Sequence, residues 1–203
     1  MKQEMRANIL DIAANDLEHS GGANLTVRYL AERANTSTQA IYTQFGGKQG
    51  LITALYQEGW DRLSETLGNL EQEEHPLEQL IRIGLAYTDF ATRNPYLYHF
   101  MIGRTLANVM VDQEQVRHSD VWQRFTAKAV RSAIKLGYLQ GSANEIGYII
   151  WSLAHGMIEL SDNGFIRPRV NEKIIRKSAL GVFLAFQGPK FTSPGNPTES
   201  WKL

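Results

Sequence analysis

Apolar side chains recur at three- and four-residue steps along almost the whole of this 203-residue chain. That spacing places them on one face of an α-helix, whereas a half-buried strand would need strict alternation. Alternating β-branched runs are few, so we predict an all-α protein. A chain of this length buries a substantial core, either as one body or as a small module fused to a larger one.

Three helical segments are predicted within the first fifty residues. The first ends at the glycine pair 21–22, because glycine supplies the positive φ that a helix C-cap uses. Thr26 is a suitable N-cap for the second helix, and Ser37 for the third. Asn35 lies at the turn between them and tolerates a left-handed backbone. The glycine pair 46–47 ends the third helix early.

Two short helices joined by a tight turn, with a preceding helix packed across both, form the helix-turn-helix plan. The second helix of such a pair enters the major groove of DNA. At about 100° per residue, four polar or amphipathic side chains share one arc of that helix, namely Thr38, Gln39, Tyr42 and Thr43. Ile41 and Phe45 point the other way. Glutamine and threonine can read base edges, tyrosine can donate to phosphate, and Lys48 adds its charge to the positive end of the next helix.

The segment TVRYLAERANTSTQAIYTQFGGKQGLI, residues 26–52, resembles the DNA-binding region of the TetR family of bacterial transcription regulators. The positions that fit the family pattern, at its spacing and without gaps, are Thr26, Leu30, Ala31, Ala34, Ser37, Ile41, Tyr42, Phe45, Lys48 and Leu51. There are three departures. Asn35 stands where the family has glycine, and Gly47 and Gln49 stand where a capping Ser or Asn and an acidic residue are usual.

The resemblance implies a set of DNA contacts. Thr26, Tyr42, Thr43 and Lys48 would contact phosphate, while Thr38 and Gln39 would face the bases, and we add Arg28 to this set. It also implies a ligand-responsive regulator, expected to be a repressor, that binds palindromic operator DNA as a homodimer and is released by a small-molecule effector. The alternative for this segment is a helical hairpin whose polar face is merely solvated.

Trp151, His155 and Glu159 share one face of a helix predicted from Ala143 to Asp162. The surrounding sequence IIWSLAHGMIEL resembles the Trp-x-x-x-His-Gly signature of one C-terminal class of the TetR family, the WHG domain. Trp151 and His155 either line an effector pocket or form a packed core pair, and both interpretations stay open. By family analogy the other pocket-lining candidates are Tyr87, Phe90, Met101, Trp122 and Phe125. Such residues are more often simply core.

We divide the chain into an N-terminal three-helix DNA-binding domain, residues 1–49, and a C-terminal helical effector-binding and dimerisation domain, residues 50–187. The tail, residues 188–203, is rich in turn formers and is expected to be disordered. Further helices are expected from Tyr96 to Asn108 and from about Glu114 to Leu136. The final two helices, apolar on both faces, are expected to pair with their copies, which would place the recognition helices about 34–36 Å apart, one turn of DNA.

The distribution of charge along the chain is more informative about function than the net charge. The 21 basic residues are matched by 21 acidic ones, so the whole chain lacks the basic excess typical of DNA-binding proteins. However, residues 34–57 contain no Asp or Glu, with Arg33 before them and Lys48 among them. A phosphate-facing surface needs only such a patch free of negative charge.

Other features exclude several protein classes. Cysteine is absent, which excludes disulfide frameworks and thiolate metal sites and agrees with a cytoplasmic location. The N-terminus lacks the apolar core of a secretory signal, and the most apolar stretch, 146–160, falls short of the roughly 20 residues that span a bilayer. We therefore expect a cytoplasmic protein with no membrane partner and no cofactor.

An enzyme is the main alternative class. The chain has no glycine-rich phosphate loop and no HExxH motif, and its five histidines show no metal-ligand pairing. We therefore predict no enzymatic activity. A helical bundle that only binds other proteins is the second alternative, and it gives no reason for the polar arc on the third helix.

Overall fold

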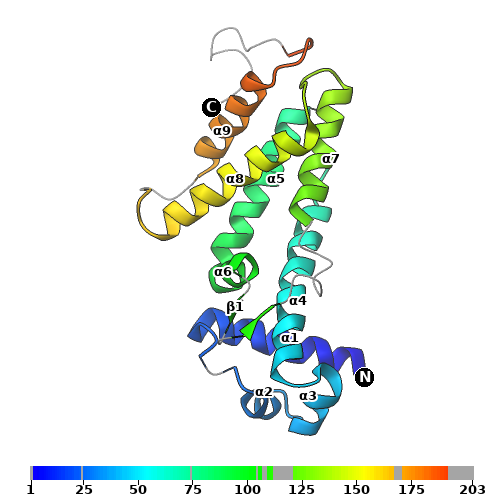
Figure 1. Ribbon diagram of the computed structural model, residues 1–203, viewed down its shortest axis with the longest axis vertical. Coiled ribbons are helices and arrows are strands. Elements are labelled where there is room, and N and C mark those ends of the chain that lie inside the picture. Colours follow the sequence, from blue (N-terminus) through cyan, green and yellow to red (C-terminus); the bar gives the residue numbers. More distant parts are fainter. Residues whose placement is uncertain are drawn as a thin grey trace. The chain divides into compact units, whose positions relative to one another are not determined.

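The structure is a computed structural model, which describes residues 2–23, 25–73, 75–103, 105–106, 109–111, 121–166 and 171–191. These residues form nine helices and one short β-hairpin (Figure 1), so the predicted all-α class is confirmed. None of the described helices combines the length and the apolar character needed to cross a membrane. The chain divides into two compact units, Met1–Leu63 with Ala91–Ser119, and Ser64–Phe90 with Asp120–Leu203.

The elements of the first unit are α1 (Lys2–Ser20), α2 (Val27–Arg33), α3 (Thr38–Phe45), most of α4 (Lys48–Gly68), the end of α5 (Pro76–Arg93), α6 (Pro95–Gly103), β1 (Thr105–Leu106) and β2 (Val109–Met110). Its core contains an apolar face of α1, in which Ile9, Ala13 and Leu17 are buried, together with Leu30 and Ile41. The carboxylate of Glu18 accepts hydrogen bonds from the backbone N–H groups of Tyr96 and Leu97 at 3.3 and 2.8 Å. An α1 side chain therefore caps the N-terminus of α6.

Capping residues set the ends of α2 and α3, as the sequence predicts. The Thr26 hydroxyl oxygen accepts from the Tyr29 N–H at 3.1 Å, and Ser37 accepts from the Ala40 N–H at 3.1 Å. Asn35 is left-handed, with φ 49°, and Gly46 ends α3 with φ 74°. The turn between α2 and α3 and the break after α3 are therefore confirmed.

The helix expected from Tyr96 to Asn108 is shorter than predicted. It ends at Gly103 and is followed by an antiparallel hairpin in which Thr105 pairs with Met110 and Leu106 with Val109. The reason is tertiary, because Leu106 is buried and packs against Gly22. Of the helix expected from Glu114, residues 112–120 lie outside the described residues, and the described part, α7, runs from Val121 to Lys135.

The second unit is built on α5, α7, α8 (Ala143–Asp162) and α9 (Glu172–Ala185). Ser142 caps α8 and Asn171 caps α9, each through a side-chain oxygen that accepts a backbone N–H. Residues 188–191, assigned from sequence to a disordered tail, instead continue the folded chain. Gly188 and Lys190 donate backbone hydrogen bonds, both of 2.9 Å, to the carbonyls of Tyr138 and Gly137. The rest of that tail, residues 192–203, lies outside the described residues.

Candidate nucleic-acid interface

Helix α3 has one buried side and one exposed side. Ile41 is fully buried and Phe45 is 8% exposed. The polar arc predicted from helical spacing is exposed at every position: Thr38, Gln39, Tyr42 and Thr43. Tyr42 stands out because 54% of this large side chain is exposed. The helix therefore presents amphipathic and hydrogen-bonding groups to solvent from a rigidly packed element.

The other members of the predicted DNA-binding set are also exposed. Thr26 and Arg28 lie at the start of α2, and Lys48 is the first residue of α4. Helices α2 and α3 pack on each other, and α4 begins just beyond the end of α3 (Figure 1). The first turn of α4 holds no acidic residue, so Lys48 and the backbone N–H groups there favour an anion.

Hydrogen bonds refine what the individual hydroxyls can do. The Thr26 oxygen accepts from a backbone N–H, so its own proton stays available for a phosphate oxygen. The Thr43 hydroxyl instead donates to the Gln39 carbonyl at 2.8 Å. In this conformation Thr43 offers an acceptor and a methyl group, which suit a base edge or a thymine methyl. The phosphate contact that the resemblance implies for Thr43 would require that bond to break.

The position of α3 depends on two contacts that sequence reasoning missed. The Arg6 guanidinium lies over the Phe45 ring, 4.9 Å from its centroid, and connects α1 to the end of α3. A Cβ added to Gly50 would lie only 1.7 Å from the Phe45 carbonyl oxygen. Glycine at position 50 therefore allows the end of α3 to approach the first turn of α4 closely. The Arg6 contact joins residues far apart in the sequence, whereas Phe45 and Gly50 are close in sequence but belong to different helices.

Another missed contact joins α1 to α2. The Tyr29 side chain hydrogen bonds to the carboxylate of Asp16, and this bond raises the pKa of Tyr29 above its usual value. Asp16 is 8% exposed and also accepts from the Ser20 hydroxyl at 3.1 Å. A mostly buried carboxylate is thereby satisfied, and α2 is fixed to the helix that supports it.

The β-hairpin also contacts this region. The side-chain amide of Gln49 donates to the Met110 carbonyl at 3.2 Å. Gln49 is one of the departures from the family pattern, and it lies next to Lys48. An acidic residue here, as is usual in the family, has no proton to donate to that carbonyl at neutral pH. The contact with the hairpin thus explains the glutamine at this position. The sequence around Gln49 does not predict that contact.

The structure does not bring together all the residues predicted to line an effector pocket. The Trp151 indole N–H donates to the Tyr87 hydroxyl at 3.1 Å, and Tyr87 is fully buried, which favours a core role for Trp151. Phe90 is buried, while Phe125 and His155 are half-buried. Met101 is buried in the first unit, where it packs against Gly59. The side chain of Trp122 lies outside the described residues.

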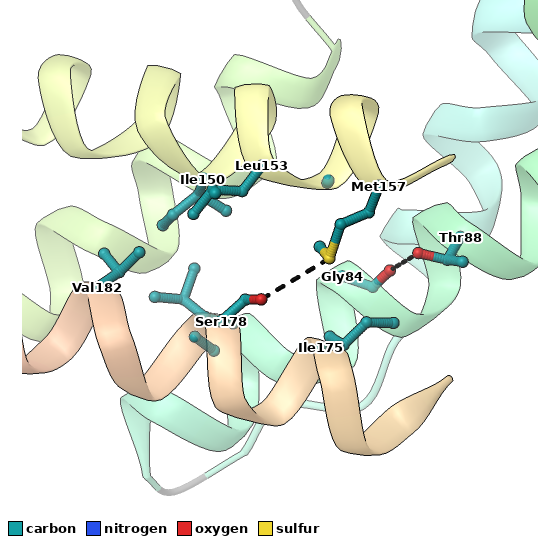
Figure 2. A pocket seen from close by; sticks show the side chains of 11 residues that line it. Gly84, Thr88, Ile150, Leu153, Met157, Ile175, Ser178 and Val182 are labelled. Atoms are coloured by element: carbon teal, nitrogen blue, oxygen red, sulfur yellow. Dashed lines mark hydrogen bonds between the residues drawn. The ribbon is translucent and has the colours of Figure 1, made fainter. Parts of the chain in front are cut away.

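A small apolar cavity lies between α5, α8 and α9 (Figure 2). Its volume is about 40 Å³, whereas sites for small-molecule ligands are usually of the order of 300–1,000 Å³. Its polar groups are engaged, because Thr88 donates to the Gly84 carbonyl and Ser178 to the Met157 sulfur. None of the predicted effector residues lines it, and its size excludes a drug-sized ligand.

Helices α8 and α9 expose large apolar side chains. Tyr148, Leu153 and Leu160 on α8 are 51%, 41% and 47% exposed, and Leu184 on α9 is 43% exposed. A Cβ added to Gly156 on α8 would meet no atom within 4 Å. These helices therefore have an apolar surface that the described part of the chain leaves open to solvent.

Comparison with known proteins gives matches over most of the chain. Residues 9–55 match the family described as bacterial regulatory proteins, tetR family, and residues 80–175 match the tetracyclin repressor-like C-terminal domain. The nucleoid occlusion factor SlmA of Marinomonas sp. (strain MWYL1) is 29% identical over 126 residues, 61% of this chain and 62% of that protein. This chain thus spans less than two thirds of that relative.

The nucleoid occlusion factor SlmA of Alteromonas mediterranea is 26% identical over 179 residues, 85% of this chain and 89% of that protein. Among solved structures, a protein with unknown function from Rhodococcus sp. RHA1 superposes with a TM-score of 0.79 at 23% identity. The superposition covers 90% of this chain and 95% of the other. This last likeness shows a shared fold.

Proposed function

The chain belongs to the TetR family of bacterial regulatory proteins, and on this premise we propose that it is a ligand-responsive repressor of transcription. Members of this family are DNA-binding regulators and not enzymes. In the proposal the protein binds palindromic operator DNA as a homodimer and is released by a small-molecule effector. The observation that carries it is the exposed polar arc of α3, held from behind by buried Ile41 and Phe45.

The contacts on α2, α3 and α4 support a division of roles. Gln39 and Thr38, exposed on α3, read base edges, and Thr43 adds its methyl group and acceptor oxygen. Thr26 and Tyr42 donate hydrogen bonds to DNA phosphates, and the cations Arg28 and Lys48 form ion pairs with DNA phosphates. The absence of acidic residues from 34 to 57 keeps this face free of repulsion.

The proposed homodimer forms through α8 and α9. Their exposed side chains Tyr148, Leu153, Leu160 and Leu184 supply the apolar area that an isologous interface buries. Gly156 lets the partner helix approach closely, because no atom of the described chain occupies the space beside it. A monomer would leave this surface in water, which is unfavourable.

The effector site is proposed for the second unit. Of the residues predicted for it, Tyr87, Phe90, Phe125, Trp151 and His155 belong to this unit. Tyr87 and Trp151 are hydrogen bonded to each other, while Phe125 and His155 are half-buried rings that sequence reasoning also assigned to the site. The effector must bind one arrangement of the dimer better than the other, since equal affinity shifts nothing. The WHG class of this domain stays a prediction.

Fluorescence anisotropy with the DNA upstream of the protein's own gene tests the proposal. Gln39→Ala should change which operator variants are preferred, whereas Lys48→Ala should weaken binding to all of them and flatten its salt dependence. Gln44→Ala, on the same helix but outside the arc, and Lys135→Ala, on α7, are matched controls expected to bind as the wild type does. Absence of binding to any DNA at low salt would refute the proposal.

A second candidate function is nucleoid occlusion, the activity in the name of two relatives. The likeness over 85% of this chain and 89% of the Alteromonas protein favours it. Deletion of the gene separates the two functions. A nucleoid occlusion factor predicts division septa over unsegregated nucleoids, whereas a repressor predicts raised transcripts from a few genes and normal septa.

A further inference from the structure

A second cavity in the second unit is large enough for a small ligand. It lies between the end of α4, the segment before α5, and α7, and its volume is about 270 Å³, close to the lower end of the usual range for ligand sites. Its floor is apolar, with Leu67 and Ile83 buried and Phe125 half-buried. Its rim is polar and exposed, with Gln72, Lys128 and Ser132. We call it the α4–α7 groove.

The groove lining contains one cation, Lys128, and one described carboxylate, Glu73. Its carboxylate, Glu73, forms an ion pair with Arg82, and the Glu73 backbone N–H donates to the Gln79 side-chain oxygen at 2.7 Å. Arg82, which also lies 3.7 Å from a carboxylate oxygen of Glu71, thus holds the Glu73 carboxylate in an ion pair. Lys128 forms no ion pair with any residue that the structure describes. Within the described part of the chain, the groove thus offers at its mouth a cation that no carboxylate pairs with.

The lining of α7 combines this cation with a hydroxyl and a ring. Phe125, Lys128 and Ser132 are spaced i, i+3 and i+7, so they project from one face of the helix into one groove. An ammonium group and a hydroxyl a turn apart can bind the two oxygens of one carboxylate. The ring lies beyond them, where the apolar part of the same molecule would be shielded from water.

We propose that the α4–α7 groove binds a small amphipathic organic anion. The carboxylate of this ligand pairs with Lys128 and Ser132, and its short apolar body covers Phe125, Leu67 and Ile83. A neutral or cationic molecule with the same body leaves Lys128 unpaired and binds less well. Neither a metal nor a covalent step is involved.

The groove is connected to the proposed DNA interface by one continuous helix. α4 begins at Lys48, in the DNA-binding set, and ends at Gly68, which lines the groove and whose added Cβ would lie 3.8 Å from the Phe125 ring. The identification of this anion as the effector rests on the proposed function. Binding of the anion in the groove does not.

Calorimetric titration of the full-length protein without DNA tests the assignment. The probes are octanoate, 1-octanol and octylammonium, which share one apolar chain and differ only in the charge of the head group. Octanoate should bind with a dissociation constant at least about tenfold below those of the other two, equivalent to about 1.4 kcal/mol. Added salt should weaken octanoate binding and leave 1-octanol binding unchanged.

Variants locate the site. Lys128→Gln, an exposed substitution that leaves the fold intact, should bring octanoate down to the affinity of 1-octanol. Phe125→Ala should weaken both, and Lys135→Gln, exposed on the same helix outside the groove, should change neither. Failure of octanoate to saturate, or equal octanoate binding by Lys128→Gln and the wild type, would overturn the groove assignment.

Operator binding, measured separately by anisotropy, distinguishes the two proposals. If the protein binds octanoate through Lys128 and binds no DNA, the groove assignment stands and the proposed function fails. If it binds its operator and ignores octanoate, the proposed function stands and the groove assignment fails. Release of the operator by octanoate in the wild type but not in Lys128→Gln would support both.

Discussion

Gly50→Ala tests how the recognition helix is positioned. The added Cβ would lie 1.7 Å from the Phe45 carbonyl oxygen, whereas carbon and oxygen normally approach to about 3.3 Å. The end of α3 and the start of α4 must therefore separate by roughly 1.5 Å. Because the obstructing atom is backbone, no side-chain rotation relieves the clash. Overpacking of this kind costs about 3 kcal/mol, the upper end of its usual range.

Two other glycines of the first unit provide matched controls for this substitution. Gly46 has φ 74° and Gly103 does not have a positive φ, and an added Cβ would meet no atom within 4 Å at either. Gly46→Ala should cost about 1–2 kcal/mol, from the left-handed backbone alone. Gly103→Ala should remain within about 0.5 kcal/mol of the wild type. The three substitutions add the same methyl group and differ in the surrounding atoms at Gly50 and in the backbone conformation at Gly46.

Thermal unfolding followed by circular dichroism measures the three effects. For a chain of this size 1 kcal/mol corresponds to about 2–4 °C, so Gly50→Ala should lower Tm by about 6–12 °C. Below its transition, Gly50→Ala should also bind operator at least about tenfold more weakly, because Tyr42 and Lys48 no longer keep their spacing. If Gly50→Ala is as stable as Gly103→Ala, the close approach of α3 to α4 does not exist as described.

Three further predictions concern other contacts. Because its protonated phenol donates to Asp16, the pKa of Tyr29 is raised, so stability is full below about pH 10 and falls as pH rises through that raised pKa. Tyr29→Phe should be less stable than the wild type at neutral pH and should lack this fall at alkaline pH, and an unchanged profile would contradict the bond. Trp151→Phe removes the hydrogen bond to buried Tyr87 and should lower the free energy of unfolding, measured in urea, by about 1–3 kcal/mol. Operator binding should stay intact. Loss of the effector response without loss of stability would favour a pocket role for Trp151. Leu160→Glu should give monomers in sedimentation, with weaker operator binding, and a persistent dimer would place the interface elsewhere.

Local chemistry explains which parts of the fold were predictable. The ends of α2 and α3 follow from Thr26, Ser37 and Asn35, whose side chains or backbone conformations act on residues a few positions away. Helical spacing alone separates the buried from the exposed side of α3. These features need no knowledge of the tertiary structure, and all of them are present.

Features that depend on distant residues were not predictable. The β-hairpin replaces the end of a helix because Leu106 packs against Gly22, a contact that no local propensity encodes. The direction of the Thr43 hydroxyl depends on its rotamer. The pairing of Trp151 with Tyr87 joins residues 64 positions apart, and it favours one of the two interpretations that spacing left open.

The departures from the family pattern lie just before and just after α3; Asn35 and Gly47 have local causes, whereas Gln49 is explained by a contact with the distant β-hairpin. Asn35 occupies a left-handed turn at φ 49°, which asparagine adopts almost as readily as the usual glycine. Gly47 has φ 113°, and a Cβ there would lie 3.2 Å from the Tyr42 ring, so a capping serine would be strained and would displace that ring. The Gln49 side-chain amide donates a hydrogen bond to the Met110 carbonyl, which an ionised acidic side chain could not do. Gly47 lies between Tyr42 and Lys48. The departures therefore adjust the geometry of the DNA-facing groups without changing the chemistry of those groups.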